Sequence, residues 1–387
     1  MASAQPFSSP KPSVVMVSAG FHPYVGGAEK QALELSAALM ARGLSVKVLT
    51  RRLPGLAAVE EVRGVPVERL WCVGGGLVNA LSFMAALFSW LWRNHRTYSV
   101  IHAHLAGSPA LAAALAGRLR GKRVVVKLGG GRGIGELAVS SRSPTGRMKL
   151  KLLSWLKPQF VVVTRDLAGE CAQYLGSVPV RLMPNGVDVE RYRPVSSIQK
   201  KAARAKLGWP EGLGFLYVGR LSSEKRLEPF LEAWIDLAAE SKTPSFAAFV
   251  GDGQEGERLK ARALRRRMAG RVFVRHAMED IHEAYAAGDV FVLPSVSEGL
   301  SNALLEAMAC GLAVLGSRVG GTAETVEDAR TGFLFEPHDE AELKRQLGKY
   351  LSHPELAGKF GAAARAKVEA GYSLERLAQG YEELYAE

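Results

Sequence analysis

"DVFVLPSVSEGLSNALLEAMACG", residues 289–311, joins a short β-branched run, a polar turn and an apolar helical pattern without interruption. The run has the composition of a buried strand, Glu298 and Gly299 fall in the turn, and the helix should begin near Ser301 or Asn302. Buried strands that lead directly into helices are the repeating unit of parallel α/β sheets. The stretch therefore predicts an α/β fold. It also puts Glu298 at the carboxyl end of a strand, where such sheets bind ligands.

The same strand-and-turn unit recurs along the chain. The first half contains five candidate strands: "SVVMVSAG", "SVKVLTR", "SVIHAH", "RVVVKLG" and "FVVVTR". The second half contains five more: "GFLYVGR", "SFAAFVGDG", "RVFVRH", "DVFVLPS" and "LAVLGSR". Between the two sets, "MPNGVDVERYRPVSS" carries the Pro, Gly and Ser of a linker. Two doubly wound parallel sheets are predicted, with a site in a cleft between them.

A chain of 387 residues with 48% hydrophobic content can bury two cores of ordinary size. Its start has no basic region followed by an apolar stretch, so we expect a flexible tail over 1–12 and no signal peptide. We place one domain over 13–190 and a second over 191–370, with a closing segment over 371–387. The cysteines Cys72, Cys171 and Cys310 lie far apart and outside any metal-ligand spacing, which favours a reducing compartment, the cytoplasm.

Positive charge is concentrated in the first half. Residues 1–190 contain 23 Lys and Arg against 10 Asp and Glu, whereas residues 191–387 contain 27 against 28. Residues 93–165 hold 14 basic residues and one acid, Glu136. This bias is too large for an evenly mixed surface, and it predicts that the first domain faces an anionic partner.

Two apolar segments lie in or beside this region. Residues 70–92 carry no charge, but glycines and Asn79 leave only about 77–92 as a helix, too short to span a bilayer; a buried or partly buried domain helix is the alternative. In 147–157, an apolar helical face lies opposite a polar one: Met148, Leu152, Trp155 and Leu156 against Arg147, Lys151 and Ser154. The second segment fits either a core-facing helix with a basic back or a helix at a membrane interface.

Glu306 falls about one turn into the helix that follows Glu298. The first amides of that helix, around Leu300 to Ala303, have no intrahelical partner and carry the positive end of its dipole, so they suit a phosphate. A ligand with a sugar, a pyrophosphate and a ribose would meet Glu298, the amides and Glu306 in turn, since carboxylates accept hydrogen bonds from sugar hydroxyls. The alternative is a solvated helix start.

Three other stretches carry candidate ligand-binding residues. Arg220 follows a strand and Lys225 comes five residues later, so a loop can aim both cations at a pyrophosphate. Gly26 and Gly27 permit close backbone approach to a phosphate. His102 and His104 end a strand on the same side. Each has a plainer alternative: surface charges, an ordinary turn and core histidines.

These pieces together resemble a retaining glycosyltransferase of the GT-B fold, in the large family four. The matching motifs occur in the family's order over nearly the whole chain: "GGAEK", "VIHAH", "MPNGVD", "LYVGRLSSEKRL", "FVGDGQEGERL", "VFVLPSVSEGLSNALLEAMACG" and "VGGTAETVEDARTGFLFEPHD". The resemblance implies an acceptor-binding domain over 13–190, a nucleotide-sugar-binding domain over 191–370 and a last helix, 371–387, that crosses back to the first domain.

The resemblance assigns roles to the candidate residues. The catalytic group would be Glu298, His104, Arg220 and Lys225, with Glu298 on the donor sugar and His104 near the reacting sugar. Donor binding would add Glu306 on the ribose, and Gly26, Gly27, Gly299, Leu300 and Ser301 near the diphosphate. The loop from Arg275 to Met278 would hold the base, largely through its backbone. One departure is "VVVKLGGGRGIGEL", where Lys127 and a glycine run replace the His-Gly or His-Asp pair of many relatives.

The implied reaction transfers a sugar from a nucleotide-diphosphate donor, UDP rather than GDP, to a hydroxyl acceptor with retention. No Asp-x-Asp occurs in the chain, so we expect no metal and no other cofactor. Bacterial glycan, glycolipid or polysaccharide synthesis is the implied setting. Because of the charge bias, we expect a lipid-linked acceptor, an anionic membrane surface as partner and a peripheral position on the cytoplasmic membrane face.

Other functions fit less well. "GGGRGIGE" fails the G-x-G-x-x-G pattern of nicotinamide enzymes in every register, and no Gly-Lys pair is followed by the Ser or Thr of an ATP-binding loop. Two alternatives stay open: a catalytically silent sugar-nucleotide-binding protein, and a basic nucleic-acid-binding protein, although we expect no nucleic acid because no reader motif is present.

Overall fold

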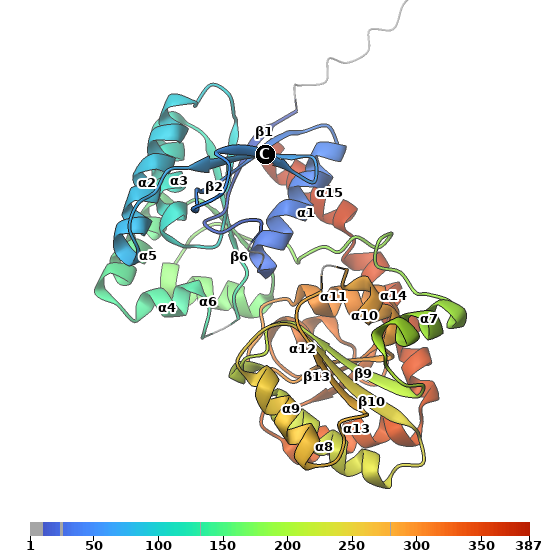
Figure 1. The fold of residues 1–387 in the computed structure, drawn as a ribbon. Coiled ribbons are helices and arrows are strands. Elements are labelled where there is room, and N and C mark those ends of the chain that lie inside the picture. The colour runs from blue at the N-terminus through green and yellow to red at the C-terminus, as the bar shows by residue number, and fades with distance from the viewer. Residues whose placement is uncertain (1–10, 24–25, 132, 279) are drawn as a thin grey trace, which may run out of the picture. The chain divides into compact units, whose positions relative to one another are not determined.

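The computed structural model describes residues 11–23, 26–131, 133–278 and 280–387, which form two α/β units (Figure 1). Residues up to Gly129, 133–183 and 374–387 belong to the first unit, and 184–373 belong to the second with Gly130 and Gly131. The chain therefore changes unit at Met183 and again at Ser373, whereas the sequence placed these boundaries at 190 and 370. Of the tail expected over 1–12, residues 1–10 lie outside the described residues.

The first unit is built on an eight-stranded sheet in the order β3-β4-β2-β1-β5-β6-β7-β8, parallel except for the β3–β4 pair. Its strands are β1 (Ser13–Val17), β2 (Ser45–Arg51), β3 (Val59–Val62), β4 (Val65–Leu70), β5 (Val100–His104), β6 (Arg123–Leu128), β7 (Gln159–Val162) and β8 (Val180–Leu182). The sequence patterns missed β3, β4 and β8. These three carry charged residues and are partly exposed, so they lack the continuous apolar run of a buried parallel strand.

Helices cover both faces of this sheet (Figure 1). They are α1 (Gly27–Ala41), α2 (Gly76–Arg93), α3 (Ser108–Arg120), α4 (Glu136–Ser141), α5 (Pro144–Leu156), α6 (Arg165–Leu175) and α15 (Leu374–Ala386). Helix α2 is close to the predicted span of 77–92. The C-terminal α15 packs against α1 and enters the same hydrophobic core through Leu377, Tyr381 and Leu384. The first and last helical segments of the chain are therefore joined in one unit.

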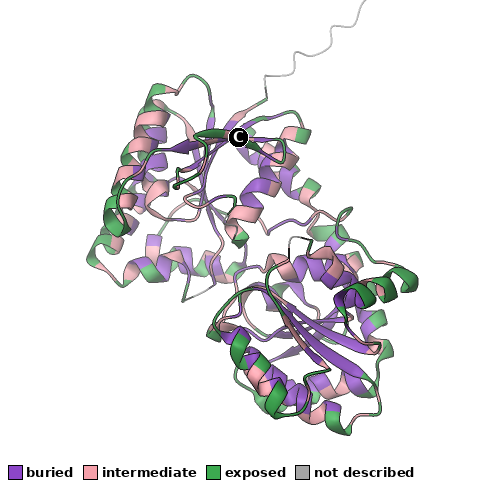
Figure 2. Cartoon of the chain, in the orientation of Figure 1, coloured by how far each residue is buried: buried purple, intermediate pink, exposed green. Residues whose placement is uncertain are grey.

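The second unit contains a fully parallel six-stranded sheet in the order β11-β10-β9-β12-β13-β14. Its strands are β9 (Leu213–Val218), β10 (Ser245–Val250), β11 (Val272–Arg275), β12 (Val290–Leu293), β13 (Ala313–Ser317) and β14 (Gly332–Phe335). Its helices are α7 (Ser197–Leu207), α8 (Leu227–Glu240), α9 (Glu255–Arg265), α10 (His282–Ala287), α11 (Asn302–Ala309), α12 (Gly320–Thr325), α13 (Glu340–Ser352) and α14 (Glu355–Gly371), with a 3₁₀ turn at Ser223–Lys225. The strands are buried between the helices, except for the edge strand β11, which is partly exposed (Figure 2).

Each sheet reverses its strand order at one point, between β1 and β5 in the first unit and between β9 and β12 in the second. At such a switch point the two connections leave on opposite faces of the sheet, so a crevice opens at the carboxyl ends of the strands. The predicted residues follow these four strands: Gly26 and Gly27 after β1, His104 at the end of β5, Arg220 and Lys225 after β9, and Glu298 after β12.

Candidate functional site

Lys225 and Glu298 meet at the switch point of the second unit. The Lys225 Nζ lies 2.6 Å from the Glu298 Oε1, and the Ser295 hydroxyl donates to the same oxygen at 2.6 Å. Both charged side chains are largely shielded, with 19% of Lys225 and 11% of Glu298 exposed. A shielded ion pair with an added hydrogen bond fixes the position of the carboxylate more firmly than a surface pair would.

Hydrogen bonds within the second unit fix the loop that carries Arg220 and Lys225. The buried Tyr217 donates its hydroxyl to the Arg220 carbonyl at 2.8 Å, and Gly219 adopts φ +147°, a conformation open to glycine. Burial, with the nearby Glu298 carboxylate, raises the pKa of Tyr217, so its hydroxyl keeps its proton and stays a donor. The Val296 amide also donates to the Glu224 carbonyl at 3.0 Å, which ties the loops after β9 and β12 together.

Arg220 differs from Lys225 in having no fixed partner. Arg220 is exposed, and its guanidinium forms no hydrogen bond or ion pair with the described residues. A guanidinium is planar and presents paired donors that suit phosphate oxygens. Arg220 can therefore bind an anion at this switch point without breaking a protein contact.

Helix α11 begins beside these residues. The Ser301 hydroxyl caps it by accepting from the Leu304 amide at 3.3 Å. The buried Asn185 amide donates to the Leu300 carbonyl at 3.0 Å and to the Asn302 Oδ1 at 2.9 Å. These bonds fix the helix N-terminus, where the backbone amides and the dipole favour negative charge. Asn185 comes from the "MPNGVD" linker motif, for which the sequence suggested only a connecting role.

The turn at Glu298 and Gly299 touches the start of α12. The Gly321 amide donates to the Gly299 carbonyl at 2.7 Å. A Cβ at Gly321 would lie 2.2 Å from that carbonyl oxygen, and one at Gly320 would lie 2.0 Å from the Glu298 carbonyl oxygen. Only glycine permits this approach, so the two glycines of "VGGTAET" act by holding the turn that presents Glu298.

Glu306 is buried, with 5% of the residue exposed. The Tyr285 hydroxyl donates to its Oε2 at 2.9 Å from the neighbouring α10. Burial and the Glu306 carboxylate raise the pKa of Tyr285 well above its usual value, so this donor keeps its proton. At least one of the two Glu306 carboxylate oxygens, which we expected to bind a ribose, therefore already accepts a hydrogen bond from within the unit.

The predicted base-binding loop begins at the edge strand β11. The Arg275 carbonyl accepts from the Gly251 amide at 2.9 Å, and its guanidinium donates to the Leu207 carbonyl. Because its backbone oxygen and its side chain both serve the unit's own structure, Arg275 has less to offer a base than expected. Exposed His276, with Nδ1 2.7 Å from the Asp252 Oδ1, and half-buried Met278 follow it.

The switch point of the first unit carries Gly26 and Gly27 at the start of α1. The Gly26 amide donates to the Glu29 Oε2 at 3.0 Å in a capping box. A phosphate at that amide would have to displace the carboxylate, which also repels it. The glycines thus have a helix-capping role that "GGAEK" does not distinguish from ligand binding.

His104 lies at the carboxyl end of β5 and is 6% exposed. Its ring stacks on His102 with centroids 4.5 Å apart, and the His102 Nδ1 lies 2.6 Å from the Tyr385 hydroxyl of α15. Burial and the nearby Lys127 lower the pKa of His104 to about 3, so the imidazole is neutral at physiological pH. Its Nε2 has no hydrogen-bond partner among the described residues.

Lys127 stands where many members of the family that the sequence resembles carry a His-Gly or His-Asp pair. It lies on β6, directly beside His104 of the neighbouring strand β5. It is 4% exposed, and its Nζ has no hydrogen-bond partner among the described residues and lies 5.9 Å from the centroid of the Tyr381 ring. Burial lowers its pKa to about 7. The sequence did not identify this buried cluster with Tyr381 and Tyr385, because α15 reaches it only through the tertiary fold.

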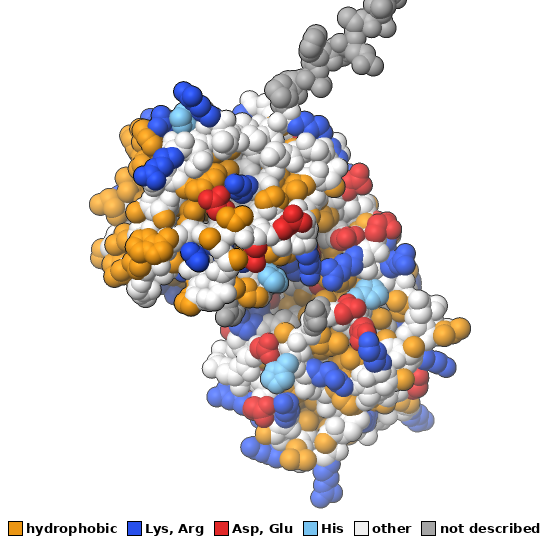
Figure 3. Space-filling view, turned by 45° about the horizontal axis from the view of Figure 1, so that its top comes forward, with side chains coloured by type: hydrophobic (Ala, Val, Ile, Leu, Met, Phe, Trp, Pro, Cys, Tyr) orange, Lys and Arg blue, Asp and Glu red, His pale blue; other side chains and the backbone are white. Residues whose placement is uncertain are grey.

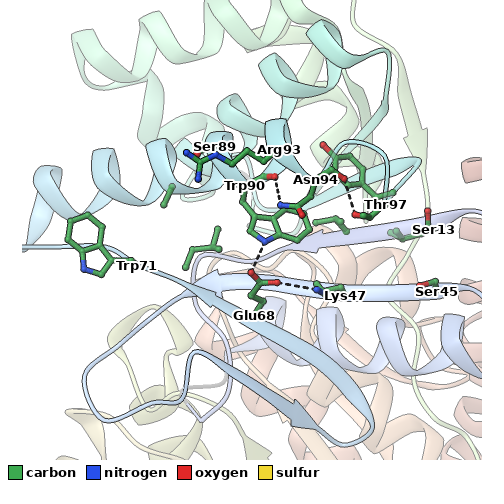
Figure 4. A pocket seen from close by; sticks show the side chains of 15 residues that line it. Ser13, Ser45, Lys47, Glu68, Trp71, Ser89, Trp90, Arg93, Asn94 and Thr97 are labelled. Carbon is green, nitrogen blue, oxygen red and sulfur yellow. Dashed lines mark hydrogen bonds and ion pairs between the residues drawn. The ribbon is translucent and has the colours of Figure 1, made fainter.

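A groove of about 650 Å³ lies elsewhere in the first unit, between α2 and the strands β1, β2 and β4 (Figure 4). None of the predicted site residues lines it. Its carboxylate, Glu68, accepts from the Trp90 indole at 2.6 Å and from the Lys47 Nζ at 3.1 Å. Glu68 and Lys47 therefore neutralise each other in this groove.

Two features are absent from the described residues. No group of three His, Cys, Asp or Glu side chains in this part of the chain is placed to hold a metal ion. Within the same ranges, no helix is both long and apolar enough to cross a bilayer.

Two successive Rossmann-like units with charged residues at a switch point are the architecture of GT-B glycosyltransferases. The chain belongs to glycosyltransferase family four. Residues 25–191 match the model described as Glycosyltransferase Family 4, and residues 199–367 match Glycosyl transferases group 1.

Its relatives include D-inositol 3-phosphate glycosyltransferase of Streptomyces scabiei, 32% identical over 54% of this chain and 50% of the relative. Sulfoquinovosyl transferase SQD2 of Arabidopsis thaliana is 36% identical over 49% of this chain and 36% of the relative. The chain thus spans half or less of the length of these two relatives.

Solved structures match the fold over nearly the whole chain. Sucrose-phosphate synthase from Thermosynechococcus elongatus superposes with a TM-score of 0.77 at 23% identity, covering 97% of this chain and 98% of that one. Anabaena HepE in complex with UDP and glucose gives 0.79 at 20% identity, covering 97% and 99%.

Proposed function

We propose that the protein transfers a sugar from a nucleotide-diphosphate donor to an acceptor hydroxyl. The observation that carries the proposal is the convergence of Arg220, Lys225 and Glu298 at one switch point. A sugar nucleotide presents a diphosphate beside sugar hydroxyls, and this site presents two cations beside a fixed carboxylate.

In the proposed step the bond between the sugar C1 and the diphosphate oxygen breaks, and its electron pair leaves with the diphosphate. The acceptor oxygen bonds to C1 from the same face, so the anomeric configuration is retained, and its proton passes to a phosphate oxygen. Arg220, Lys225 and the α11 amides neutralise the charge that grows on the leaving group. Glu298 orients the sugar through its hydroxyls.

The charge complement of this site supports transfer without a metal or other cofactor, because two cations and a helix N-terminus do the work that a divalent ion would do. UDP-sugars are our preferred donors over GDP-sugars. HepE, which shares the fold, is described in complexes with UDP and UDP-glucose.

We propose an amphiphilic, lipid-linked acceptor, in bacterial glycan, glycolipid or polysaccharide synthesis, and a cytoplasmic protein. One relative, 31% identical over 51% of this chain, is named a GDP-mannose-dependent monoacylated alpha-(1-6)-phosphatidylinositol monomannoside mannosyltransferase, from Corynebacterium glutamicum. Its acceptor is of this kind, although its donor is a GDP-sugar. WaaG, of lipopolysaccharide biosynthesis, shares the fold.

The test is a thermal-shift panel of UDP, GDP, ADP and their common sugar conjugates, with and without EDTA. A ligand that binds only the folded state stabilises it by mass action, by about 2.7 kcal/mol at a concentration 100 times its Kd, and so raises the melting temperature. We expect a shift with UDP compounds that EDTA does not remove. No shift with any nucleotide would contradict the proposal.

Binding alone would also fit a catalytically silent protein. Release of UDP from UDP-sugar, by transfer or by slow hydrolysis, separates the two. Nucleotide binding without any release, in the presence of vesicle-borne hydroxyl acceptors, would favour the silent protein.

A further inference from the structure

Helix α2 is apolar on two opposite sides. Its inner side packs through Phe83, Leu87 and Leu91, which are at most 1% exposed. Its outer side exposes Leu77 (69%), Leu81 (54%) and Trp92 (39%). A helix with apolar residues on its solvent side as well as its core side requires a second apolar environment.

Helices α3 and α5 continue this surface, because α2 packs on α3 and α3 packs on α5. Leu119 of α3 is 57% exposed. On α5, Leu150, Leu153 and Leu156 face the core, whereas Met148 and Trp155 are 58% and 62% exposed. Of the apolar face expected on α5, Leu156 is buried in the core, whereas Met148, Leu152 and Trp155 lie outside it.

Arginines are interleaved with these apolar side chains. The Arg120 guanidinium lies 3.3 Å from the Trp92 ring centroid, and that of Arg118 lies 4.8 Å from the Trp155 ring centroid. Figure 3 shows hydrophobic side chains gathered on the side of the first unit where α2 and α5 run in Figure 1, with Lys and Arg among them. Exposed cations also come from α2 and α5 themselves: Arg93, Arg147 and Lys151.

We propose that this α2–α3–α5 face, defined by Leu77, Leu81, Trp92, Leu119, Met148 and Trp155 with their neighbouring cations, lies on an anionic lipid bilayer. Its apolar side chains would enter the boundary between headgroups and acyl chains, and Lys and Arg would remain at the phosphate level. Tryptophan is enriched at this depth because its ring is apolar and its N–H is polar. The inference does not depend on the sugar-transfer reaction.

The composition of the face favours lipid over other partners. A nucleic-acid surface needs the cations but gains nothing from exposed Leu and Met beside them. A protein interface is also rich in Trp, Met and Arg, but a face with this excess of positive charge would need an acidic surface on the partner protein. Residues 93–165 carry 14 basic residues and one acid. Lys127 is buried. Exposed cations such as Arg118, Arg147 and Lys151 nevertheless give the face an excess of positive charge, which suits a surface of uniformly negative charge.

The first experiment is vesicle flotation of the full chain, with phosphatidylcholine alone and with about 30% phosphatidylglycerol, an anionic content chosen to create a surface potential. We expect flotation only with the anionic vesicles, reduced by salt. The variant Leu81→Ser/Leu119→Ser/Trp155→Ser should lose at least tenfold in vesicle affinity. The matched control is Ile198→Ser/Leu264→Ser, whose side chains are 78% and 70% exposed in the second unit. It should float like the wild type.

Two charge-reversal variants distinguish adsorption of the face on the bilayer surface from insertion of its apolar side chains into the bilayer. Arg147→Glu/Lys151→Glu should also weaken flotation at least tenfold, whereas Arg258→Glu/Lys260→Glu, on α9 of the second unit, should not. If only the charge variant loses binding and the apolar variant floats normally, the face adsorbs without entering the bilayer and the proposal is wrong. Unchanged melting temperatures and nucleotide-induced shifts in every variant show that folding and the donor site survive.

Intrinsic fluorescence gives an independent readout. Trp71, Trp92 and Trp155 are 39% to 64% exposed, whereas Trp209 and Trp234 are buried in the second unit. Brominated lipids should quench the wild type, and Trp92→Phe/Trp155→Phe should remove most of the quenching. Three further results would overturn the proposal: no vesicle binding, binding to an oligonucleotide that the apolar substitutions leave intact, or a concentration-dependent dimer that the same substitutions dissociate.

Discussion

Lys225 and Glu298 are 73 residues apart in sequence, yet the Lys225 Nζ and the Glu298 Oε1 are 2.6 Å apart. The contact exists because β9 and β12 are neighbours in the sheet and both loops leave their carboxyl ends. Donor binding would draw Lys225 toward the diphosphate and free Glu298 for sugar hydroxyls. Under the proposed function, the pair would couple the two halves of a sugar nucleotide.

Replacement of Glu298 by Gln should preserve nucleotide binding and lower transfer by about 100-fold or more, since removal of one preorganised polar group at a reacting centre costs this much. Gln keeps the shape and a hydrogen-bonding oxygen but loses the charge that holds Lys225. UDP-induced thermal shift and initial transfer rate measure the two effects. Wild-type turnover would refute the role of Glu298.

Arg220→Met should weaken UDP binding about tenfold to 100-fold, because a charge-assisted hydrogen bond contributes about 1.5–3 kcal/mol. Uridine, which has no phosphate, should bind the variant and the wild type equally. Calorimetric titration of both ligands measures the difference. Arg258→Met, at an arginine 70% exposed on α9, is the control. An equal loss for uridine would mean that Arg220 supports the fold and not the diphosphate.

Gly321→Ala should both lower the melting temperature and reduce the UDP-induced shift, because the new methyl would lie 2.2 Å from the Gly299 carbonyl oxygen. Gly358→Ala is the matched control. Gly358 is exposed in α14 with no atom within 4 Å of an added Cβ, so alanine should stabilise the helix by about 0.5–1 kcal/mol. A Gly321→Ala variant that binds UDP normally would show that the Gly299 turn does not position the site.

Lys127 should make stability depend on pH. Burial lowers its pKa from 10.5 to about 7 in the folded state. Between pH 7 and 10.5 the unfolded chain therefore binds a proton that the folded chain does not, and stability rises with pH through this window. Below pH 7, Lys127 is protonated in both states, so the free-energy cost of burying its charge is at its full value and no longer changes with pH.

Lys127→Met should remove that penalty. We expect the variant to be a few kcal/mol more stable than the wild type at pH 6.5, since each unit of pKa shift corresponds to about 1.4 kcal/mol. This advantage should shrink steadily toward pH 9.5. Chemical denaturation at several pH values measures it, with the exposed Lys157→Met as control. A difference that does not change with pH would exclude proton linkage through Lys127.

Much of the fold was predictable because its signals are local. Ten of the fourteen strands have apolar, β-branched runs that lead into turns, and these define two doubly wound sheets. Of the strands that the patterns missed, β3, β4 and β8 lie at or near sheet edges and are partly exposed, so they lack a continuous apolar run. The fourth, β14, is a buried edge strand whose short GFLF sequence contains no β-branched residue. The candidate site residues could be named from sequence for the same reason: Arg220 and Glu298 each follow a recognisable strand.

The sequence by itself determined the order of strand, turn and helix, the charge asymmetry, and which residues stand at strand ends, because these depend on neighbours along the chain. The tertiary structure decided which strand ends are adjacent and which side chains are buried, because both depend on contacts between distant segments. Only the sheet order brings Lys225 to Glu298, and only the packing of α15 buries Lys127 beside His104. Burial in turn lowers the pKa values of Lys127 and His104, an effect that sequence patterns do not encode.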